Sequence, residues 1–162
     1  MRYAQITPFE ICNGKGAGVS LFVQGCHFHC KGCFNKEAWD FNGGKEWAQE
    51  IEDKFFELIN RPYIKRVSIL GGEPLADENK SVVLDLIKKI KGKYPNKSIW
   101  LYTGYTFEKI ASLNNLQYVD VLVDGRYIEE QKDLTLEFRG SKNQRLIDVQ
   151  KTLKENKIVL YN

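Results

Sequence analysis

Short, continuous apolar runs recur along the chain and predict buried β-strands. They occupy residues 19–23, 66–70, 98–102 and 119–123, and each is followed within two residues by a glycine. A glycine-rich loop, residues 13–18, leads into the first run. Runs of this length and composition are typical of strands that are covered on both faces, as in a parallel sheet.

Three of the segments between these runs carry apolar side chains at helical spacing. Residues 46–60 have such a stripe, and Pro62 lies just beyond their end. Residues 80–91 have another, with Gly92 as the expected C-terminal stop. Residues 107–113 are predicted to form a short helix.

Strands that alternate with helices indicate parallel β-α-β units. A complete (βα) barrel takes about 250 residues, and this chain has 162. We therefore expect an α/β fold with one domain, residues 1–162, that forms a partial (βα) barrel of mostly parallel strands. The pattern weakens after Gly125, where residues 134–138 and 158–161 are predicted as further strands.

The charges give no indication of nucleic-acid or membrane binding. The net charge is +3, from 24 basic and 21 acidic residues that are interspersed along the chain. No apolar stretch approaches the roughly 20 residues that span a bilayer, and residues 1–5 do not begin a signal peptide. We expect a cytoplasmic protein with no nucleic-acid partner and no membrane partner.

The candidate chemistry lies in a cluster of cysteines. Of the four cysteines, Cys26, Cys30 and Cys33 fall within eight residues, with the spacing C-x3-C-x2-C. A 4Fe–4S cluster takes four thiolates when its ligation is complete, so three thiolates leave one iron open to a substrate. Gly25 and Gly32 allow the backbone to turn tightly around such a cluster.

Other interpretations of these cysteines remain open. Zinc could combine them with His27 or His29, although zinc sites more often pair C-x2-C with a distant second pair. A non-catalytic electron carrier could recruit Cys12 as a fourth ligand, provided that the chain doubles back. Burial of all four thiols as structural side chains is the least favoured. The two histidines are expected to be loop residues near the cluster rather than ligands.

A second motif follows the second predicted strand. It reads Gly71-Gly72-Glu73-Pro74, and ligands of parallel α/β sheets gather at the carboxyl ends of strands. The glycines permit close backbone approach, and Glu73 offers a carboxylate that suits an ammonium group. Alone, the motif could be a plain strand-to-helix turn; next to the cysteine cluster it becomes specific.

Together these motifs resemble the radical S-adenosylmethionine superfamily. More narrowly, the chain resembles the activating proteins of anaerobic (class III) ribonucleoside-triphosphate reductases, which keep only a minimal core. The narrower resemblance covers about residues 10–148 and rests on these segments: Asn13-Gly14 with Gly16, Leu21 to Cys26, Cys30 to Asn35, Thr103-Gly104-Tyr105, Val121 to Gly125, and Arg139-Gly140-Ser141 with Asn143-Gln144.

The resemblance implies two cofactors. A 4Fe–4S cluster would be held by Cys26, Cys30 and Cys33, and S-adenosylmethionine would bind the open iron through its amino and carboxylate groups. Gly72 and Glu73 would hold the ammonium end. One electron passed through the cluster would split the sulfonium into methionine and a 5′-deoxyadenosyl radical.

The resemblance also suggests contacts with the rest of S-adenosylmethionine. The backbone around Gly32, Cys33 and Phe34 would lie against the adenine. Thr103, at the end of the third predicted strand, could face the ligand too.

The implied partners are proteins. The radical would take a hydrogen atom from a glycine Cα of the anaerobic ribonucleoside-triphosphate reductase, and a flavodoxin or ferredoxin would supply the electron. Residues 139–144 could touch the reductase or could be a solvated loop. Alternatives are another small radical S-adenosylmethionine enzyme, acting on a different glycyl-radical enzyme or on a 7-deazapurine precursor, and a non-catalytic electron carrier.

The chain departs from the wider pattern in two places. Many superfamily members have an aromatic residue just before the third cysteine, and here it is Gly32. The wider group of glycyl-radical activases often has Asp-Gly-Pro-Gly-x-Arg before the first strand. Here Asn13, Lys15 and Gly18 stand in place of the Asp, Pro and Arg.

Overall fold

The computed structural model describes all residues, 1–162. A single sheet forms its centre, with the strand order β3-β1-β2-β4-β5-β6-β7. The strands are β1 (Arg2–Glu10), β2 (Gly18–Val23), β3 (Lys45–Glu46), β4 (Arg66–Gly71), β5 (Ser98–Tyr102), β6 (Val121–Asp124) and β7 (Arg145–Asp148). Strands β2, β4, β5 and β6 pair in parallel, whereas β1, β3 and β7 add antiparallel edges.

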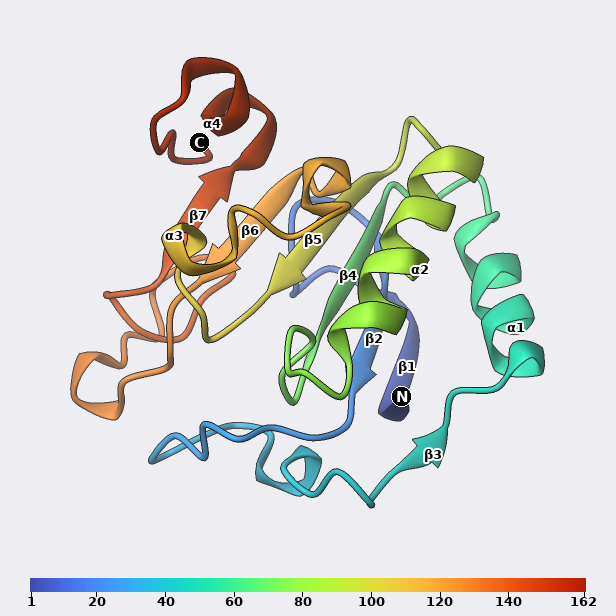
Figure 1. The fold of residues 1–162 in the computed structure, drawn as a ribbon, viewed down its shortest axis with the longest axis horizontal. Helices are drawn as coiled ribbons and strands as arrows, with labels where there is room; N and C mark the ends of the chain where they lie inside the picture. Colours follow the sequence, from blue (N-terminus) through green and yellow to red (C-terminus); the bar gives the residue numbers. More distant parts are fainter.

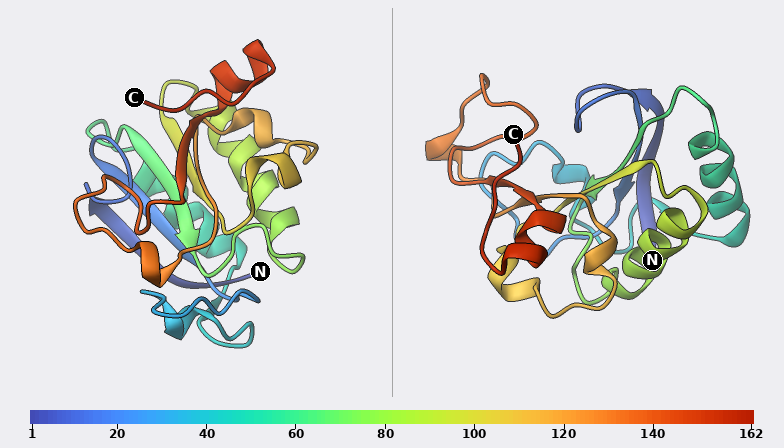
Figure 2. Two further views of the ribbon diagram at one scale, coloured as in Figure 1. Left: turned by 90° about the vertical axis from the view of Figure 1, so that its left-hand side faces the viewer. Right: turned by 90° about the horizontal axis from the view of Figure 1, so that it is seen from above.

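Helices connect the parallel strands, as the alternation of apolar runs and amphipathic segments predicts. The α-helices are α1 (Gln49–Ile59), α2 (Lys80–Lys93), α3 (Phe107–Ile110) and α4 (Val149–Glu155); the short 3-10 helices are η1 (Lys36–Ala38), η2 (Leu116–Tyr118) and η3 (Glu129–Gln131). Helix α2 lies across one face of the sheet, and α1 and α4 lie toward its opposite edges (Figures 1 and 2).

Both faces of the central strands are covered, which explains their continuous apolar sequence. In β2, Val19, Leu21 and Val23 point into the main core together with residues of α1 and α2. Alternate residues of the same strands face the other way, where Trp100 belongs to a second, smaller core. On this second face Phe22 of β2 pairs in register with Leu70 of β4.

The sequence-based prediction of a mixed α/β fold is confirmed, with a sheet that is mostly parallel in its middle. The four predicted strands are present, although the last begins at Val121 rather than at residue 119. The predicted helix at 46–60 spans Gln49–Ile59, and the one at 80–91 extends to Lys93. The predicted helix at 107–113 is shorter, ending at Ile110.

The two strands predicted near the C-terminus are wrong. Residues 134–138 form turns and bends, in which Leu134 is 81% exposed. Residues 158–161 make only one isolated bridge, from Leu160 to Ile147. In both segments the apolar residues suggested a strand, but they do not pair with a neighbouring strand in a ladder.

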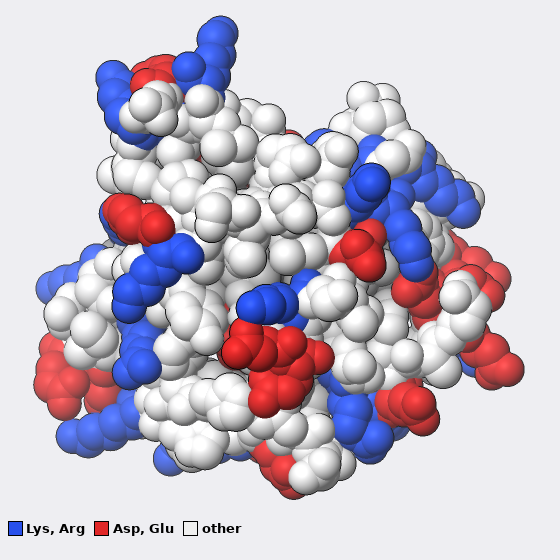
Figure 3. All heavy atoms as spheres, viewed as in Figure 1, with Lys and Arg blue, Asp and Glu red and all other residues white.

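The topology gathers the carboxyl ends of the parallel strands at one side of the sheet. In Figure 1 these ends point toward the segment of residues 24–44, which carries the cysteines. None of the helices combines the length and the apolar character that a membrane span requires. On the face seen in Figure 3, basic and acidic side chains are interspersed, as the sequence predicts.

Candidate functional site

A cavity of about 490 Å³ opens at the carboxyl ends of the parallel strands. Its lining brings together the two motifs that the sequence analysis singled out. The residues predicted to bind a cluster or cofactor that line it are Cys26, Cys30, Cys33, Phe34, Gly72, Glu73 and Thr103. Phe22, Leu70, Tyr102 and Val123, from one side of the sheet, form its apolar floor.

The cysteine loop is held in place by backbone hydrogen bonds. Gly25 N–H donates to the carbonyl of Ala38 at 2.7 Å, and Cys26 N–H donates to that of Trp39 at 3.0 Å. Cys33 N–H closes a turn onto the carbonyl of Cys30 at 3.1 Å. The loop therefore has a defined path that is set by its main chain.

The three thiols of the cysteine loop are free to act as ligands. All are free, with Cys26 buried and Cys30 and Cys33 partly exposed to the cavity. All three line the same cavity. Burial raises the pKa of Cys26 and of Cys30. A cluster would offset that cost because it binds the thiolate form.

The glycines of this loop are required by the backbone. Gly25 has φ of 99° and Gly32 has φ of 73°, both in the region that L side chains rarely adopt. A Cβ on Gly25 would also collide with the ring of Phe41, and one on Gly32 would collide with Glu129. Gly32 thus makes room for η3, which packs against the cysteine loop.

The turn after β4 contacts the cysteine loop directly. Glu73 N–H donates to the carbonyl of Gly25 at 2.8 Å. A Cβ on Gly72 would strike that same carbonyl and would lie 2.8 Å from the carbonyl of Ala38. The glycine turn and the cysteine loop are therefore joined through main-chain atoms.

The carboxylate of Glu73 is almost completely buried beside the cavity. It accepts hydrogen bonds from the Thr103 hydroxyl at 2.7 Å, from Gly104 N–H at 2.7 Å and from Leu75 N–H at 2.9 Å. Burial raises the pKa of Glu73 to about 7, although these hydrogen bonds favour the ionised form. The carboxylate retains acceptor capacity for one more donor.

A family profile described as a 4Fe-4S single cluster domain matches residues 12–147. The chain is 44% identical over 148 residues to the anaerobic ribonucleoside-triphosphate reductase-activating protein of Vibrio cholerae, covering 89% of this chain and 96% of that one. It is 38% identical to the proteins of that name from Escherichia coli K12, over 89% of this chain and 96% of the relative, and from phage T4, over 90% and 93%.

The chain belongs to the family of anaerobic ribonucleoside-triphosphate reductase-activating proteins. The resemblance that the motifs indicate is thereby confirmed. The profile spans both the cysteine loop and the glycine turn, which are the two parts of the cavity described above.

In this member of the family, Phe34 lies at the mouth of the cavity and is 59% exposed. Its ring centroid is 5.2 Å from that of Tyr127. An exposed aromatic ring at a cavity mouth offers a face on which a planar group can stack. That Phe34, Gly32 and Cys33 contact an adenine stays a prediction.

The two histidines lie on the outer side of the cysteine loop. His27 is 2.8 Å from a carboxylate oxygen of Glu78, and His29 stacks on the indole of Trp39 with ring centroids 4.4 Å apart. Neither histidine lines the main cavity. Both therefore have other partners, in keeping with the expectation that they are loop residues.

Cys12 lies nearer to the cluster site than the sequence suggests. The loop between β1 and β2 folds across the sheet, so exposed Cys12 and its neighbour Asn13 line the same cavity as the other cysteines. The antiparallel pairing of β1 with β2 doubles the chain back, which is the reversal that Cys12 needs in order to reach this cavity.

Sequence reasoning missed several residues of the cavity. Trp39 and Tyr102 line it, and each has a buried polar atom without a hydrogen-bond partner. Arg126 also lines it, with its guanidinium 4.3 Å from the centroid of the Phe28 ring. Arg126 follows the fourth predicted strand, so the rule that ligands gather at strand ends could have identified it.

Proposed function

We propose that this chain is an activating enzyme that cleaves S-adenosylmethionine reductively and generates a glycyl radical on an anaerobic ribonucleoside-triphosphate reductase. The carrying observation is that Cys26, Cys30 and Cys33 share one cavity with Gly72 and Glu73. Membership of a family whose relatives bear the name of that activity supports the proposal.

Cys26, Cys30 and Cys33 would hold a 4Fe–4S cluster with one iron left open. When bound, the cluster delivers one electron that splits the sulfonium into methionine and a 5′-deoxyadenosyl radical. The free thiols, their shared cavity and the 4Fe-4S domain match all fit this group.

The residues of the chain orient S-adenosylmethionine. Glu73 accepts one N–H of the amino group while its three existing donors keep the carboxylate fixed. Gly72 allows the ligand to approach the backbone, and the segment from Gly32 to Phe34 lies against the adenine. Thr103 acts through Glu73, because its hydroxyl is committed to that carboxylate.

The finer architecture also belongs to this proposal. Strands β2, β4, β5 and β6 form part of a (βα) barrel within a single domain, residues 1–162. Their parallel order supports this. A partial barrel leaves an open side, which a protein substrate needs in order to bring its glycine to the cavity.

The partners follow from the same chemistry. A flavodoxin or ferredoxin in the cytoplasm supplies the electron, and the reductase receives the radical. The interspersed charges of the face in Figure 3 support the expectation that nucleic acid is not a partner.

A reconstitution experiment tests the proposal. The protein is loaded with iron and sulfide without oxygen, reduced, and given S-adenosylmethionine with and without the reductase. We expect 5′-deoxyadenosine and methionine, and a glycyl-radical signal in electron paramagnetic resonance when the reductase is present. A Cys33→Ala protein serves as the control and should give neither.

The outcomes separate the alternatives. Failure to form 5′-deoxyadenosine would exclude the proposed cleavage of S-adenosylmethionine. Cleavage without a radical on the reductase would favour a different glycyl-radical enzyme or a small-molecule substrate.

One observation favours a second candidate, a non-catalytic electron carrier. Exposed Cys12 lines the same cavity and is free, so it could complete a set of four thiolates. A cluster that is lost in Cys12→Ala and that does not respond to S-adenosylmethionine would support this candidate.

A further inference from the structure

Two hydrogen-bond donors in the cavity have no partner within the chain. The hydroxyl of Tyr102 and Nε of Arg139 are buried and unpartnered, and both residues line the cavity. Burial raises the pKa of Tyr102, so its hydroxyl stays protonated and can donate. Trp39 Nε1 is also unpartnered, but Trp39 is bonded to the cysteine loop. Because buried donors are rarely left unsatisfied, Tyr102 and Arg139 indicate a ligand that offers acceptors.

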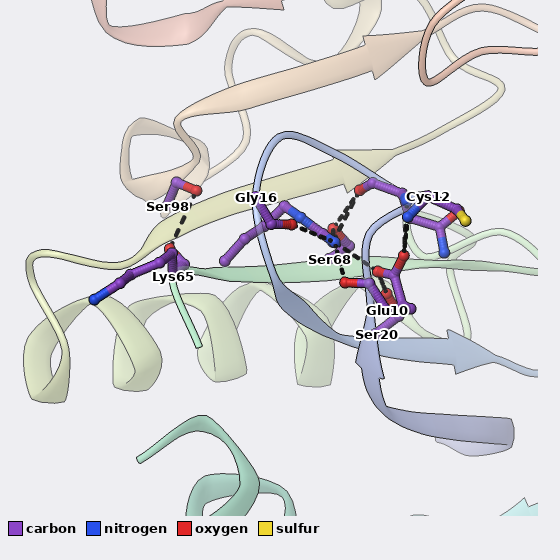
Figure 4. Close-up of polar contacts among 9 residues, drawn as sticks. Glu10, Cys12, Gly16, Ser20, Lys65, Ser68 and Ser98 are labelled. Carbon is purple, nitrogen blue, oxygen red and sulfur yellow. Dashed lines mark hydrogen bonds and ion pairs between the residues drawn. The ribbon is translucent and has the colours of Figure 1, made fainter. Parts of the chain in front are cut away.

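One wall of the cavity is the connection from β1 to β2, which contributes Cys12 and Asn13. Completely buried Arg66 of β4 donates to the Glu10 carboxylate at 2.7 Å and to the carbonyl of Asn13 at 3.0 Å. The Ser68 hydroxyl donates to the same carbonyl at 2.6 Å. Figure 4 shows Glu10 and Ser68 in this network, with the sulfur of Cys12 pointing away from it. The wall is therefore held to the sheet by hydrogen bonds, while the Cys12 thiol stays free.

A second wall is part of the connection from η3 to β7. An isolated bridge between Lys132 and Ser141 closes its base. Within it, Phe138 packs edge-on against Trp100, with ring centroids 5.1 Å apart. A Cβ on Gly14, in the first wall, would lie 2.7 Å from Cδ2 of the same Trp100. Both walls therefore rest on one buried side chain and lie close to each other.

The space between the two walls is a slot, bounded by residues 12–13 and 134–139 with Tyr102 in its floor. Leu134 lines the slot and is 81% exposed. An apolar side chain that is exposed at the rim of a cavity offers a contact to a partner. The slot and the cysteine loop belong to one cavity, so an occupant of the slot reaches the cofactor.

The occupant follows from the proposed function, on which this inference rests. The reacting atom is a glycine Cα within a polypeptide, and transfer of a hydrogen atom requires that this atom touch the radical. An extended polypeptide presents main-chain carbonyls, which are acceptors whatever its side chains are. We propose that the slot receives the substrate segment that carries the glycine, with Tyr102 Oη and Arg139 Nε donating to its main-chain carbonyls. Leu134 contacts a side chain of the same segment.

Cys12 reports occupancy of the slot without any chemistry at the cluster. The full chain without iron is mixed with a synthetic peptide centred on the radical-forming glycine of the reductase, or with a scrambled peptide. Iodoacetamide alkylates the thiols, and mass spectrometry follows the rate at Cys12. The glycine peptide should slow that rate roughly tenfold when its concentration is about ten times its dissociation constant. The scrambled peptide should not.

Three variants test the assigned contacts. Tyr102→Phe removes only the hydroxyl and Arg139→Met only the donor group, and each should weaken peptide binding by roughly two- to tenfold. Leu134→Asp should weaken it by roughly tenfold through loss of an apolar contact. Tyr63→Phe is the matched control, because Tyr63 is half exposed and lies outside the cavity. It should bind the peptide as the unchanged protein does.

Urea unfolding separates recognition from a structural role. The Tyr102 hydroxyl has no partner in the chain, so Tyr102→Phe should keep the urea resistance of the unchanged protein while it weakens peptide binding. A hydroxyl that acts only in the fold would change the urea resistance and leave peptide binding as it was.

The inference is overturned if the glycine peptide does not slow alkylation of Cys12. It is also overturned if Tyr102→Phe or Arg139→Met binds the peptide as tightly as the unchanged protein. If Arg139→Met does not fold, Tyr102→Phe and Leu134→Asp decide, since the side chain of Leu134 is already in solvent. Formation of 5′-deoxyadenosine and of the glycyl radical judges the proposed function separately. Radical formation without protection of Cys12 would therefore overturn this inference alone.

Discussion

Thr103 Oγ1 donates a hydrogen bond to Glu73 at 2.7 Å, which links the end of β5 to the turn after β4. Both residues are almost inaccessible, at 6% and 2% exposure. The sequence places Thr103 at a strand end, where it could face the ligand. The structure shows that its hydroxyl is used to hold the carboxylate that faces the cavity.

Replacing Thr103 by valine should therefore destabilise the protein. The buried carboxylate of Glu73 would lose one of three donors, and the free energy of unfolding should fall by about 1–3 kcal/mol. Thr103→Ser keeps the hydroxyl and should be close to the unchanged protein. Urea unfolding of the iron-free chain measures both, and equal stability of the valine and serine variants would contradict the assignment.

Binding of S-adenosylmethionine should depend on pH through Glu73. Burial raises its pKa to about 7, so the carboxyl group is protonated below that pH and can no longer accept, as an anion, a hydrogen bond from the amino group. The affinity should fall by roughly tenfold for each pH unit below 7 and level off above it. Calorimetric titration of the reconstituted protein at several pH values measures this dependence.

Glu73→Gln is the matched control for that titration. Its affinity should be low and should lack the change that Glu73 causes near pH 7, because the amide does not ionise. A wild-type affinity that stays constant through pH 7 would show that the amino group does not contact Glu73.

Two glycine variants should have opposite effects. Gly72→Ala places a methyl group against the carbonyls of Gly25 and Ala38, so the glycine turn and the cysteine loop cannot keep their contact. It should lower both stability and iron content. Gly92→Ala adds a methyl group into open space in α2 and should stabilise the protein by up to about 1 kcal/mol. Urea unfolding and iron analysis of both variants measure these effects. A Gly72→Ala protein with a full complement of iron would show that the contact between the glycine turn and the cysteine loop is not needed.

The cysteines should separate into two groups. Alanine at Cys26, Cys30 or Cys33 should each prevent cluster assembly and formation of 5′-deoxyadenosine, because a cluster held by two thiolates is no longer anchored. Cys12→Ala should keep both. Iron, sulfide and 5′-deoxyadenosine are measured for all four proteins. Loss of the cluster from Cys12→Ala as well would count against an open iron.

The central strands were predictable because their burial is visible in their own short stretches of sequence. Strands covered on both faces have continuous apolar sequences, so β2, β4, β5 and most of β6 could be recognised. β1 could not, because only Tyr3 of its nine residues is buried and the strand shows no alternation. Residues 134–138 were wrongly predicted as a strand, because their apolar side chains Leu136 and Phe138 line the cavity instead of packing in a sheet.

The candidate site was predictable only in part, because some of its contacts join segments that lie far apart in the sequence. The rule that ligands gather at strand ends brings the cysteine loop and the Gly-Gly-Glu-Pro turn together, and the structure does place them around one cavity. The commitment of Thr103 to Glu73 and the place of Cys12 both depend on contacts between distant segments. Arg66 shows the same limit, because nothing local marks it as the partner of Glu10.

The main-chain hydrogen bond from Glu73 N–H to the carbonyl of Gly25 has a consequence for the order in which the protein folds and receives its cluster. It forms only when β2 and β4 are already aligned, and the buried core beneath these strands contains no metal-binding group that folding would have to await. The polypeptide should therefore acquire its shape first and receive iron and sulfide afterwards. In this respect it would differ from zinc fingers, which need their metal in order to fold. Assembly of the inorganic centre would then be the closing step of biogenesis.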